Sequence, residues 1–343
     1  MSEGMTPNAA AALLTPFSTG LLPFPEGARS LLLRAAADPA LAPWRGGLVC
    51  AQGFRPAFNA LAAAGFDVRP DAPEEGGFAT VLCLLSKHKA VALADVARAL
   101  DLVAEGGLVV CAGAADAGAA AVEKAAARAF GGIGRLSKHH CRVFWLRRNG
   151  PLPPLCASWR AAAGARPVAA IEAVSAPGVF GWDRIDPGSR LLAGCLDARI
   201  SGRVADFGAG WGYLCREMLR RCPGIASLDA VEAEAAALAA ARLNLAPPPG
   251  VALALRWHDV LAEPGLGPYD WVISNPPFHD GKAGDPEIGR GFIRAARAAL
   301  APGGHLLLVA NRHLPYESAI DAAFSARAVA AEDSAFKVIE ART

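Results

Sequence analysis

An acidic residue followed by alternating glycines is the first cluster that could do chemistry. Asp206 ends a short apolar run, and Gly208, Gly210 and Gly212 follow at every second position before an amphipathic stretch. Glycines permit a tight strand-to-helix turn and a close approach of the backbone to a ligand. Asp206 disfavours the pyrophosphate of a dinucleotide, and no G-x-x-x-x-G-K-[ST] phosphate loop is present. S-adenosylmethionine (SAM), which has an ammonium group but no phosphate, fits this turn better.

Two further acids follow at the ends of predicted strands. Glu232 ends the apolar run 227–232 and lies 22 residues beyond Gly210. A carboxylate in that place can accept hydrogen bonds from both ribose hydroxyls of a nucleoside. Asp259 follows the next predicted strand, where it could accept from an adenine amino group. Asp229 competes with Glu232 but lies earlier in its strand. The order of these acids predicts a nucleoside site.

A rigid loop, Asn275-Pro276-Pro277-Phe278, follows the predicted strand 269–274. The two prolines stiffen the loop and remove backbone donors, so its carbonyls remain as acceptors. This set suits a planar base with an exocyclic amine, which would donate to Asn275 and to the Pro276 carbonyl while the ring stacks on Phe278. Methyl transfer to such an amine requires mainly orientation, and no strong general base is obvious.

Composition bounds the class of protein. The 343 residues are 53% hydrophobic and 19% charged, which favours two domains with a sizeable core. A net charge of only +2 excludes a globally basic nucleic-acid coat protein. No apolar run reaches the roughly 20 residues that a bilayer needs, and the N-terminus lacks a signal-peptide pattern, so we expect a cytoplasmic protein without a membrane partner. The eight cysteines form no C-x-x-C pair and predict reduced thiols, with neither a metal nor a disulfide-linked partner. Nothing in the sequence indicates the oligomeric state.

Two halves of the chain repeat the order strand, helix, glycine pair, strand. The second half has 269–274, 291–300, Gly303-Gly304 and 305–310, and the first has 78–85, 90–103, Gly106-Gly107 and 108–112. The alternation predicts an α/β fold of two tandem Rossmann-like units with mostly parallel sheets, and internal duplication is the preferred explanation. A proline-rich break at 148–154 places the domains at 1–150 and 155–343.

Charge is unevenly distributed between these halves. Residues 1–150 hold 15 Lys and Arg against 12 Asp and Glu, and the segment 124–148 has seven basic residues and no acidic one. Such a patch can neutralise phosphates, although a solvated basic face without a partner explains the charge equally well.

Several motifs resemble those of the RsmC/RlmG-type ribosomal RNA guanine-N2 methyltransferases. They are Pro177-Gly178-Val179-Phe180, Asp186-x-Gly188-Ser189-x-Leu191-Leu192, the sequence Ser-Asn-Pro-Pro-Phe-His-Asp-Gly at 274–281, Val-Ala-Asn-Arg-His-Leu-Pro-Tyr at 309–316, and Phe-Lys-Val at 336–338. The resemblance is strong over about 175–340 and looser before it. The chain departs from many relatives in having Glu232 where they have Asp, and in the bulk of Trp211 and Tyr213 within the glycine turn.

The resemblance implies that both units have the class I methyltransferase fold and that the first is a degenerate copy that no longer binds SAM. The first half accordingly lacks the Asp-x-Gly-x-Gly and Asn-Pro-Pro-Phe motifs. Its implied role is to support RNA binding, for which the candidates are Lys87, Lys89, Arg135, Lys138 and Arg142.

The resulting hypothesis is methyl transfer from SAM to N2 of a guanosine in ribosomal RNA, with S-adenosylhomocysteine as the second product. The cofactor would lie over the Asp206–Gly212 turn, with its ribose at Glu232, its adenine at Asp259 and Phe180 over its methionine end. The target base would be extruded from structured RNA. The small-subunit 16S rRNA is favoured from the resemblance alone, and a large-subunit target stays open. A protein-glutamine N5 methyltransferase and a non-catalytic RNA-binding protein are the alternatives from other classes.

Overall fold

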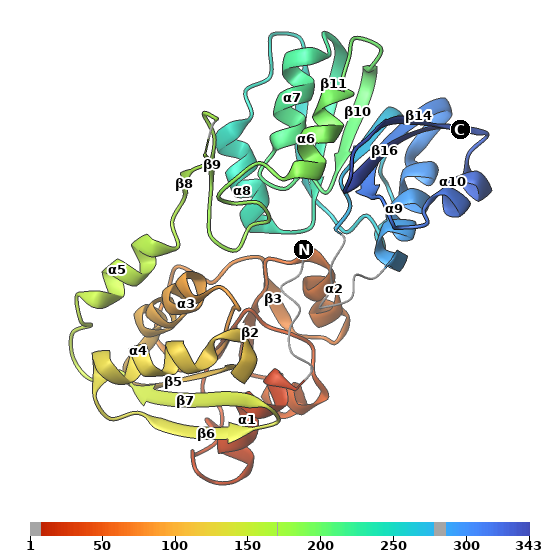
Figure 1. The fold of residues 1–343 in the computed structure, drawn as a ribbon. Coiled ribbons are helices and arrows are strands. Elements are labelled where there is room, and N and C mark those ends of the chain that lie inside the picture. The colour runs from red at the N-terminus through yellow and green to blue at the C-terminus, as the bar shows by residue number, and fades with distance from the viewer. Residues whose placement is uncertain (1–7, 170, 278–285) are drawn as a thin grey trace. The chain divides into compact units, whose positions relative to one another are not determined.

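The chain folds into two compact units that divide between Gly164 and Ala165. The computed structural model in Figure 1 describes residues 8–169, 171–277 and 286–343. The division lies beyond the proline-rich break because the helix Leu155–Ala162 belongs to the first unit, where Cys156 and Trp159 are buried in its core. None of the helices in these described ranges is both long and apolar enough to cross a membrane.

The first unit alternates strands and helices. Its elements in chain order are α1 (Ala9–Ser18), β1 (Ser30–Leu33), η1 (Pro39–Trp44), β2 (Leu48–Ala51), α2 (Arg55–Ala63), β3 (Asp67–Arg69), β4 (Phe78–Leu84), α3 (Lys89–Leu102), β5 (Val103–Ala114), η2 (Ala115–Ala117), α4 (Ala119–Phe130), β6 (Gly134–Lys138), β7 (Cys141–Arg147) and α5 (Leu155–Ala162).

The second unit begins with a short two-stranded ribbon and then repeats the alternation. Its elements are β8 (Arg166–Pro167), β9 (Val174–Ser175), α6 (Pro187–Gly194), β10 (Ser201–Phe207), α7 (Tyr213–Arg221), β11 (Gly224–Glu232), α8 (Ala235–Asn244), β12 (Ala252–Trp257), β13 (Tyr269–Ser274), α9 (Pro286–Ala299), β14 (Leu300–Asn311), α10 (Glu317–Ala323), β15 (Ala326–Glu332) and β16 (Phe336–Arg342).

The two main sheets have the same strand order. The first is β3-β2-β1-β4-β5-β7-β6 and the second is β12-β11-β10-β13-β14-β16-β15, so each strand of one has a counterpart in the other. In both, the first five strands are parallel and the last two form an antiparallel hairpin. The predicted α/β fold with two mostly parallel sheets is therefore confirmed, and the shared order is what a duplicated unit would have.

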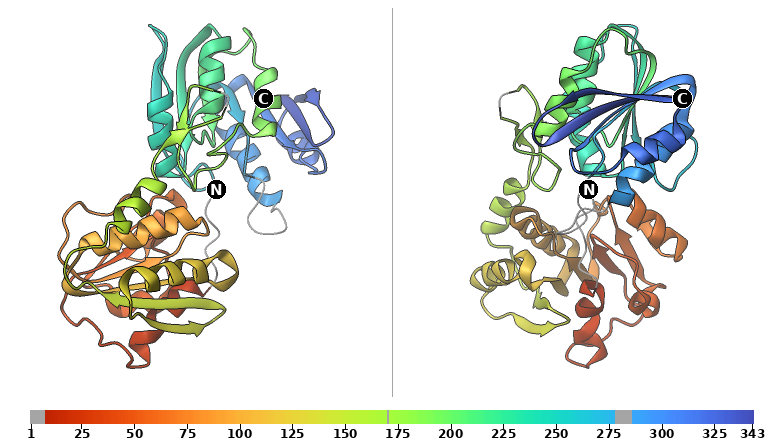
Figure 2. Two further views of the ribbon diagram at one scale, coloured as in Figure 1. Left: turned by 60° about the vertical axis from the view of Figure 1, so that its left-hand side comes forward. Right: turned by 45° about the vertical axis from the view of Figure 1, so that its right-hand side comes forward.

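Helices cover both faces of the second sheet (Figures 1 and 2). Neighbouring residues of a strand point to opposite faces, so Ile273 packs with α6 and α7 on one face while Val272 packs with α9 and α10 on the other. Burial on both faces explains why these strands are continuous apolar runs. The strands β10, β11, β12 and β13 all end at one edge of the sheet, where doubly wound folds bind their ligands.

Candidate functional site

A turn of three left-handed glycines follows β10. Gly208, Gly210 and Gly212 have φ angles of 82°, 56° and 92°, which a residue with a Cβ adopts only with strain. The amides of Gly208 and Ala209 donate to the Val231 carbonyl at 2.9 and 3.1 Å, which ties the turn to the neighbouring strand. The backbone thereby forms the tight strand-to-helix connection into α7 that the spacing predicts.

Glu232 lies at the end of β11 and holds this turn. Its Oε2 accepts the Gly210 amide and its Oε1 accepts the Glu234 amide, both at 2.8 Å. Each carboxylate oxygen has a second lone pair, so a ligand hydroxyl can still be accepted. The competing acid Asp229 is already bound by the Tyr269 hydroxyl and the Arg256 guanidinium, and this pairing keeps it out of the site.

Asp259 is buried just beyond the end of β12. Its Oδ1 accepts the Leu261 amide at 2.9 Å, and its own amide donates to Glu263 Oε2 at 2.8 Å. These bonds fix a tight turn at the same edge of the sheet as Glu232, whose carbonyl accepts the His258 amide at 3.0 Å.

Asp206 is fully buried at the end of β10, one residue before Phe207. The Cys215 thiol donates to its Oδ2 at 3.2 Å, whereas its Oδ1 has no hydrogen-bond partner within the described ranges. The pKa of Asp206 is raised to about 7, mainly by burial and in part by the nearby charge of Glu232, while hydrogen bonds from Cys215 oppose the rise. A buried acceptor without a partner indicates a place where a ligand or water is bound.

Asn275 begins the loop after β13, and its amide is held by the start of α6. Its Nδ2 donates to Asp186 Oδ2 at 3.0 Å and to Ser189 Oγ at 2.7 Å, and its buried Oδ1 has no hydrogen-bond partner among the residues that the structure describes. Ser274 Oγ anchors the strand end by donating to the Phe207 carbonyl at 2.7 Å. Pro276 is buried and Pro277 is half-buried. Phe278 lies outside the described residues.

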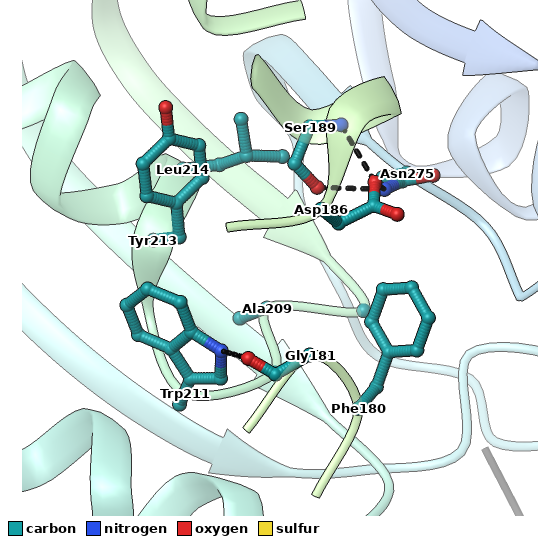
Figure 3. Close-up of a pocket in the computed structure, with 11 residues that line it drawn as sticks. Phe180, Gly181, Asp186, Ser189, Ala209, Trp211, Tyr213, Leu214 and Asn275 are labelled. Carbon is teal, nitrogen blue, oxygen red and sulfur yellow. Dashed lines mark hydrogen bonds between the residues drawn. The ribbon is translucent and has the colours of Figure 1, made fainter. Parts of the chain in front are cut away.

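A partly open pocket joins the glycine turn to this loop (Figure 3). Asp186, Ser189 and Asn275 lie together in Figure 3, with Phe180 and Trp211 further along the pocket. Phe180 lines the pocket and is 43% exposed. The complete lining is Phe180, Gly181, Asp186, Ser189, Gly208, Ala209, Gly210, Trp211, Tyr213, Leu214 and Asn275. The pocket thus collects the predicted residues Phe180, Gly208, Gly210 and Asn275, whereas Asp206, Glu232 and Asp259 are not among its lining.

The segments 165–169 and 171–186 (together, the strap) are attached to the glycine turn by two residues whose contacts the sequence does not predict. Trp211 donates from Nε1 to the Gly181 carbonyl at 3.1 Å. Asn244 accepts the Val174 amide and donates to the carbonyls of Val174 and Trp211, each at 2.8 Å. Nothing in the spacing of Asn244 at the end of α8 distinguishes it from a surface residue, because its partners are backbone groups distant in sequence.

The first unit has different side chains at the equivalent edge. Leu33 pairs with Ala51 and Cys83 as Phe207 pairs with Val231 and Ser274, so Arg34, Gln52 and Leu84 occupy the places of Gly208, Glu232 and Asn275. Arg34 keeps a left-handed φ of 54°, and the Ala35 amide donates to the Ala51 carbonyl at 3.0 Å, as Ala209 does to Val231. Gln52 accepts the Phe54 amide at 2.7 Å but turns its own amide onto the Ala35 carbonyl. The turn is preserved without its glycines or its carboxylate.

The candidate RNA-binding residues differ in whether an acidic side chain lies close to their charge. Lys87 and Lys89 are exposed beside the end of β4, and Lys138 is exposed in the β6–β7 hairpin. Arg135 and Arg142 both lie within 4.0 Å of the Glu123 carboxylate, at 3.9 and 3.8 Å. The sequence does not predict these two ion pairs, because Glu123 lies just before the segment 124–148, which has no acidic residue.

The residues at the edge of the second sheet fit SAM. Glycine backbone, a nearby carboxylate at Glu232 and an unpartnered buried oxygen on Asp206 suit a cationic nucleoside better than a phosphate ligand. The eight cysteines are free thiols, and the described residues contain no group of three His, Cys, Asp or Glu side chains that could hold a metal ion.

Comparison with known proteins gives the family. The Methyltransferase small domain family matches residues 170–340. Ribosomal RNA small subunit methyltransferase C of Shewanella sp. (strain MR-4) is 34% identical over 271 residues, which cover 78% of each chain. The protein of the same name from Shewanella loihica is 40% identical over 161 residues, 47% of this chain and 46% of that one.

A solved structure matches across both units. It is the T. thermophilus 16S rRNA N2 G1207 methyltransferase (RsmC) in complex with AdoMet, that is SAM, and guanosine. The TM-score is 0.79 at 25% sequence identity, and the match covers 99% of this chain and 93% of that chain. The chain therefore belongs to the ribosomal RNA small subunit methyltransferase C family of SAM-dependent enzymes.

Proposed function

We propose that this protein transfers a methyl group from SAM to the exocyclic N2 of a guanosine in 16S ribosomal RNA. The observation that carries the proposal is the pocket in which the glycine turn meets the buried, unpartnered Oδ1 of Asn275. Membership of the family and the guanosine in the similar T. thermophilus structure support guanine as the target base.

The residues that would hold SAM come from three strand ends. The backbone of Gly208, Gly210 and Gly212 permits close approach, Glu232 accepts the ribose hydroxyls, and Asp259 accepts the adenine amine. Asp206 lies behind the turn with one oxygen to spare, and Phe180 covers the methionine end of the pocket. When bound, SAM supplies a methyl carbon activated by its sulfonium. Because Asp206 is fully buried, water would weaken its attraction to the bound cation only a little.

Asn275 and the Pro276 carbonyl would hold the amine of the base. An aromatic amine is a poor nucleophile because its lone pair is delocalised into the ring. Two acceptors that bind its two N–H groups keep the nitrogen closer to tetrahedral and aim the lone pair, so that orientation lowers the barrier. The rigid Pro276-Pro277 pair fixes where these acceptors lie. Phe278 is proposed to stack on the base.

The first unit, which the sequence places at 1–150, is proposed to be a degenerate copy that supports RNA binding. The replacement of Gly208, Glu232 and Asn275 by Arg34, Gln52 and Leu84 at equivalent strand positions supports the loss of cofactor binding. The exposed Lys87, Lys89 and Lys138, together with Arg135 and Arg142, are proposed to contact phosphates. Naked rRNA and the assembled small subunit are both possible forms of the substrate.

The central test is the Asn275→Ala variant. We expect it to bind SAM with unchanged affinity by calorimetry, because the side chain faces the base and not the cofactor. Its kcat for transfer of tritiated methyl groups to 16S rRNA should fall by about 10²- to 10³-fold, as when an enzyme loses one pre-oriented polar group. Asn149→Ala, at an exposed position in the first unit, is the matched control.

Two outcomes would count against the proposal. Normal turnover by Asn275→Ala would remove the role given to its amide. Methylation of a release factor in place of rRNA by the native protein would favour glutamine N5 chemistry. Mass mapping of the methylated nucleoside in rRNA from a deletion strain and from the complemented strain identifies the guanosine.

A further inference from the structure

The start of α6 holds the amide of Asn275 in one orientation. Asp186 is the N-cap residue of α6, and its Oδ2 accepts the Ser189 amide at 2.8 Å. The Asn275 side-chain nitrogen, Nδ2, donates hydrogen bonds to the same Oδ2 and to the Ser189 hydroxyl oxygen, at 3.0 and 2.7 Å (Figure 3). Both N–H groups of the Asn275 side chain are thereby directed at α6.

The chemistry of Asp186 decides which end of the amide faces it. An ionised carboxylate only accepts hydrogen bonds, so the Asn275 nitrogen must lie against it. The reversed amide would place Oδ1 against the carboxylate and leave two oxygens in repulsion. Oδ1 is therefore left on the other side, where it is buried and has no partner. An unpaired buried acceptor costs free energy until a donor reaches it.

A neighbouring glycine makes room for this arrangement. Gly188 is buried, and a Cβ at this position would lie 3.2 Å from Asp186 Oδ2 and 3.1 Å from the ring of Phe336. Any larger residue would therefore press on the carboxylate that contacts Asn275. The spacing Asp186-x-Gly188-Ser189 thus provides the carboxylate, the space and the hydroxyl that the contact needs.

We propose that Asp186 and Ser189 are positioning residues, which fix the Asn275 amide so that its Oδ1 can accept a hydrogen bond from the substrate amine. The inference rests on the proposed function, since it concerns the same pocket. The fixed amide also makes the site selective. A base edge with an amine at this point completes the Oδ1 hydrogen bond, whereas an edge with a carbonyl would face another oxygen.

A double-mutant cycle tests the route of the effect. Asp186→Asn keeps a good helix cap but no longer forbids the reversed amide, and Ser189→Ala removes one acceptor. We expect kcat for 16S rRNA methylation to fall about tenfold in each, with SAM affinity within about twofold of native by calorimetry. In an Asn275→Ala background, Asp186→Asn should cause no further loss, because residues that act as a unit are not additive. Asp71→Asn and Ser318→Ala, both at exposed positions, are the matched controls.

A charge swap keeps the test sensitive if Asn275→Ala has too little activity to measure. Asn275→Asp alone would place two carboxylates in contact. Adding Asp186→Asn lets the new amide donate to the new carboxylate, which keeps one free acceptor in the pocket. We expect the double variant to be at least tenfold more active than Asn275→Asp, with both variants folded by thermal denaturation.

The outcomes separate this inference from the proposed function. Loss of SAM affinity at unchanged kcat in Asp186→Asn would make Asp186 a cofactor ligand and overturn the positioning role. An equal loss in the native and Asn275→Ala backgrounds, or no rescue in the swap, would overturn it as well. In each of these cases an inactive Asn275→Ala leaves the role proposed for Asn275 standing, whereas a fully active one removes both that role and this inference.

Discussion

Asp206 lies in an environment that disfavours its charge in the unliganded protein. It is fully buried, Oδ1 has no hydrogen-bond partner among the described residues, and Oδ2 accepts from the weakly donating Cys215 thiol. Its pKa is raised to about 7, chiefly by burial, so ionising this carboxyl group at higher pH destabilises the folded protein. Such groups concentrate at functional sites, which fits a place behind the proposed cofactor turn.

Asp206→Asn should make the stability of the unliganded protein less dependent on pH. The folded pKa lies above the unfolded one, so the contribution of Asp206 to the unfolding free energy is complete below about pH 4 and is lost as the pH rises to about 7. The variant should therefore gain on the order of 2 kcal/mol relative to the native protein between pH 5 and pH 8. Urea denaturation at both pH values measures this difference.

Asp183→Asn is the control for that comparison, because Asp183 is exposed. A constant difference between Asp206→Asn and the native protein at the two pH values would show that Asp206 does not titrate in this range. The asparagine variant should also bind SAM more weakly, since it lacks the charge behind the turn.

Residues whose partners lie in their own motif were predictable from the sequence. Gly208, Gly210 and Glu232 lie where the strand-end pattern places them, and Asn275 faces the same pocket as the glycine turn. Asp186 and Ser189 belong to a recognisable motif, but their contact with Asn275 joins positions almost 90 residues apart. Spacing along one element cannot reveal such a contact.

At the scale of elements, the strap shapes the pocket by its attachment to the glycine turn. Asn244 at the end of α8 joins β9 to the Trp211 carbonyl, and Trp211 in turn holds Gly181. The bulk of Trp211, which departs from the usual pattern of the turn, is used in this attachment, since its ring is buried among residues of the strap and α8. The position of Phe180 therefore depends on residues outside the motifs.

Asn244→Ala should weaken both stability and cofactor binding. Three hydrogen bonds of about 1 kcal/mol each are lost, so we expect the free energy of unfolding to fall by about 2–3 kcal/mol. SAM affinity should fall several-fold because the strap is no longer fixed beside the pocket. Urea denaturation and calorimetry measure the two effects, with Asn149→Ala as the control. Unchanged SAM affinity in a destabilised variant would mean that the strap does not contribute to the cofactor site.

Strands were easier to predict than the limits of the units. Buried parallel strands such as β4 and β13 are short apolar runs bounded by polar or glycine-rich turns, and the sequence located them to within a residue. The proline-rich segment after β7 ends a strand, but α5 beyond it still packs on α3 through Trp159. A proline break indicates where an element stops, and only tertiary packing determines where a compact unit stops.

At the scale of the whole molecule, charge and chemistry are divided between two copies of one topology. The first unit keeps the turn geometry but carries Arg34 and Gln52 in it, and its exposed Lys87 and Lys89 follow β4 at the equivalent edge of its own sheet. The net charge of +2 conceals this division. In the basic segment, Glu123 partly neutralises Arg135 and Arg142, which charge counting over 124–148 did not detect.

Glu123→Gln should strengthen RNA binding if Arg135 and Arg142 contact phosphates. The substitution keeps the shape of the side chain and removes the carboxylate that competes with phosphate for the two guanidinium groups. We expect a tighter dissociation constant for 16S rRNA fragments and a salt dependence that is steeper by roughly 0.7–0.9 per additional phosphate contact. Filter binding at salt concentrations between about 50 and 200 mM measures the dissociation constant and its salt dependence. Glu74→Gln, at an exposed position, is the control, and an unchanged slope would place the arginines outside the RNA interface.

The strand order of the two sheets has a consequence for the protein while it is being made. In each sheet the strand that comes last in sequence, β7 or β16, is inserted between two earlier strands. The first sheet can therefore close once Arg147 has been synthesised, whereas the second must wait for Arg342. At about 5–20 residues per second this interval lasts roughly 10–40 s. A growing chain can therefore complete the first unit while the second sheet still lacks an interior strand. We expect it to become competent for methyl transfer only after the final residues of β16 have been synthesised.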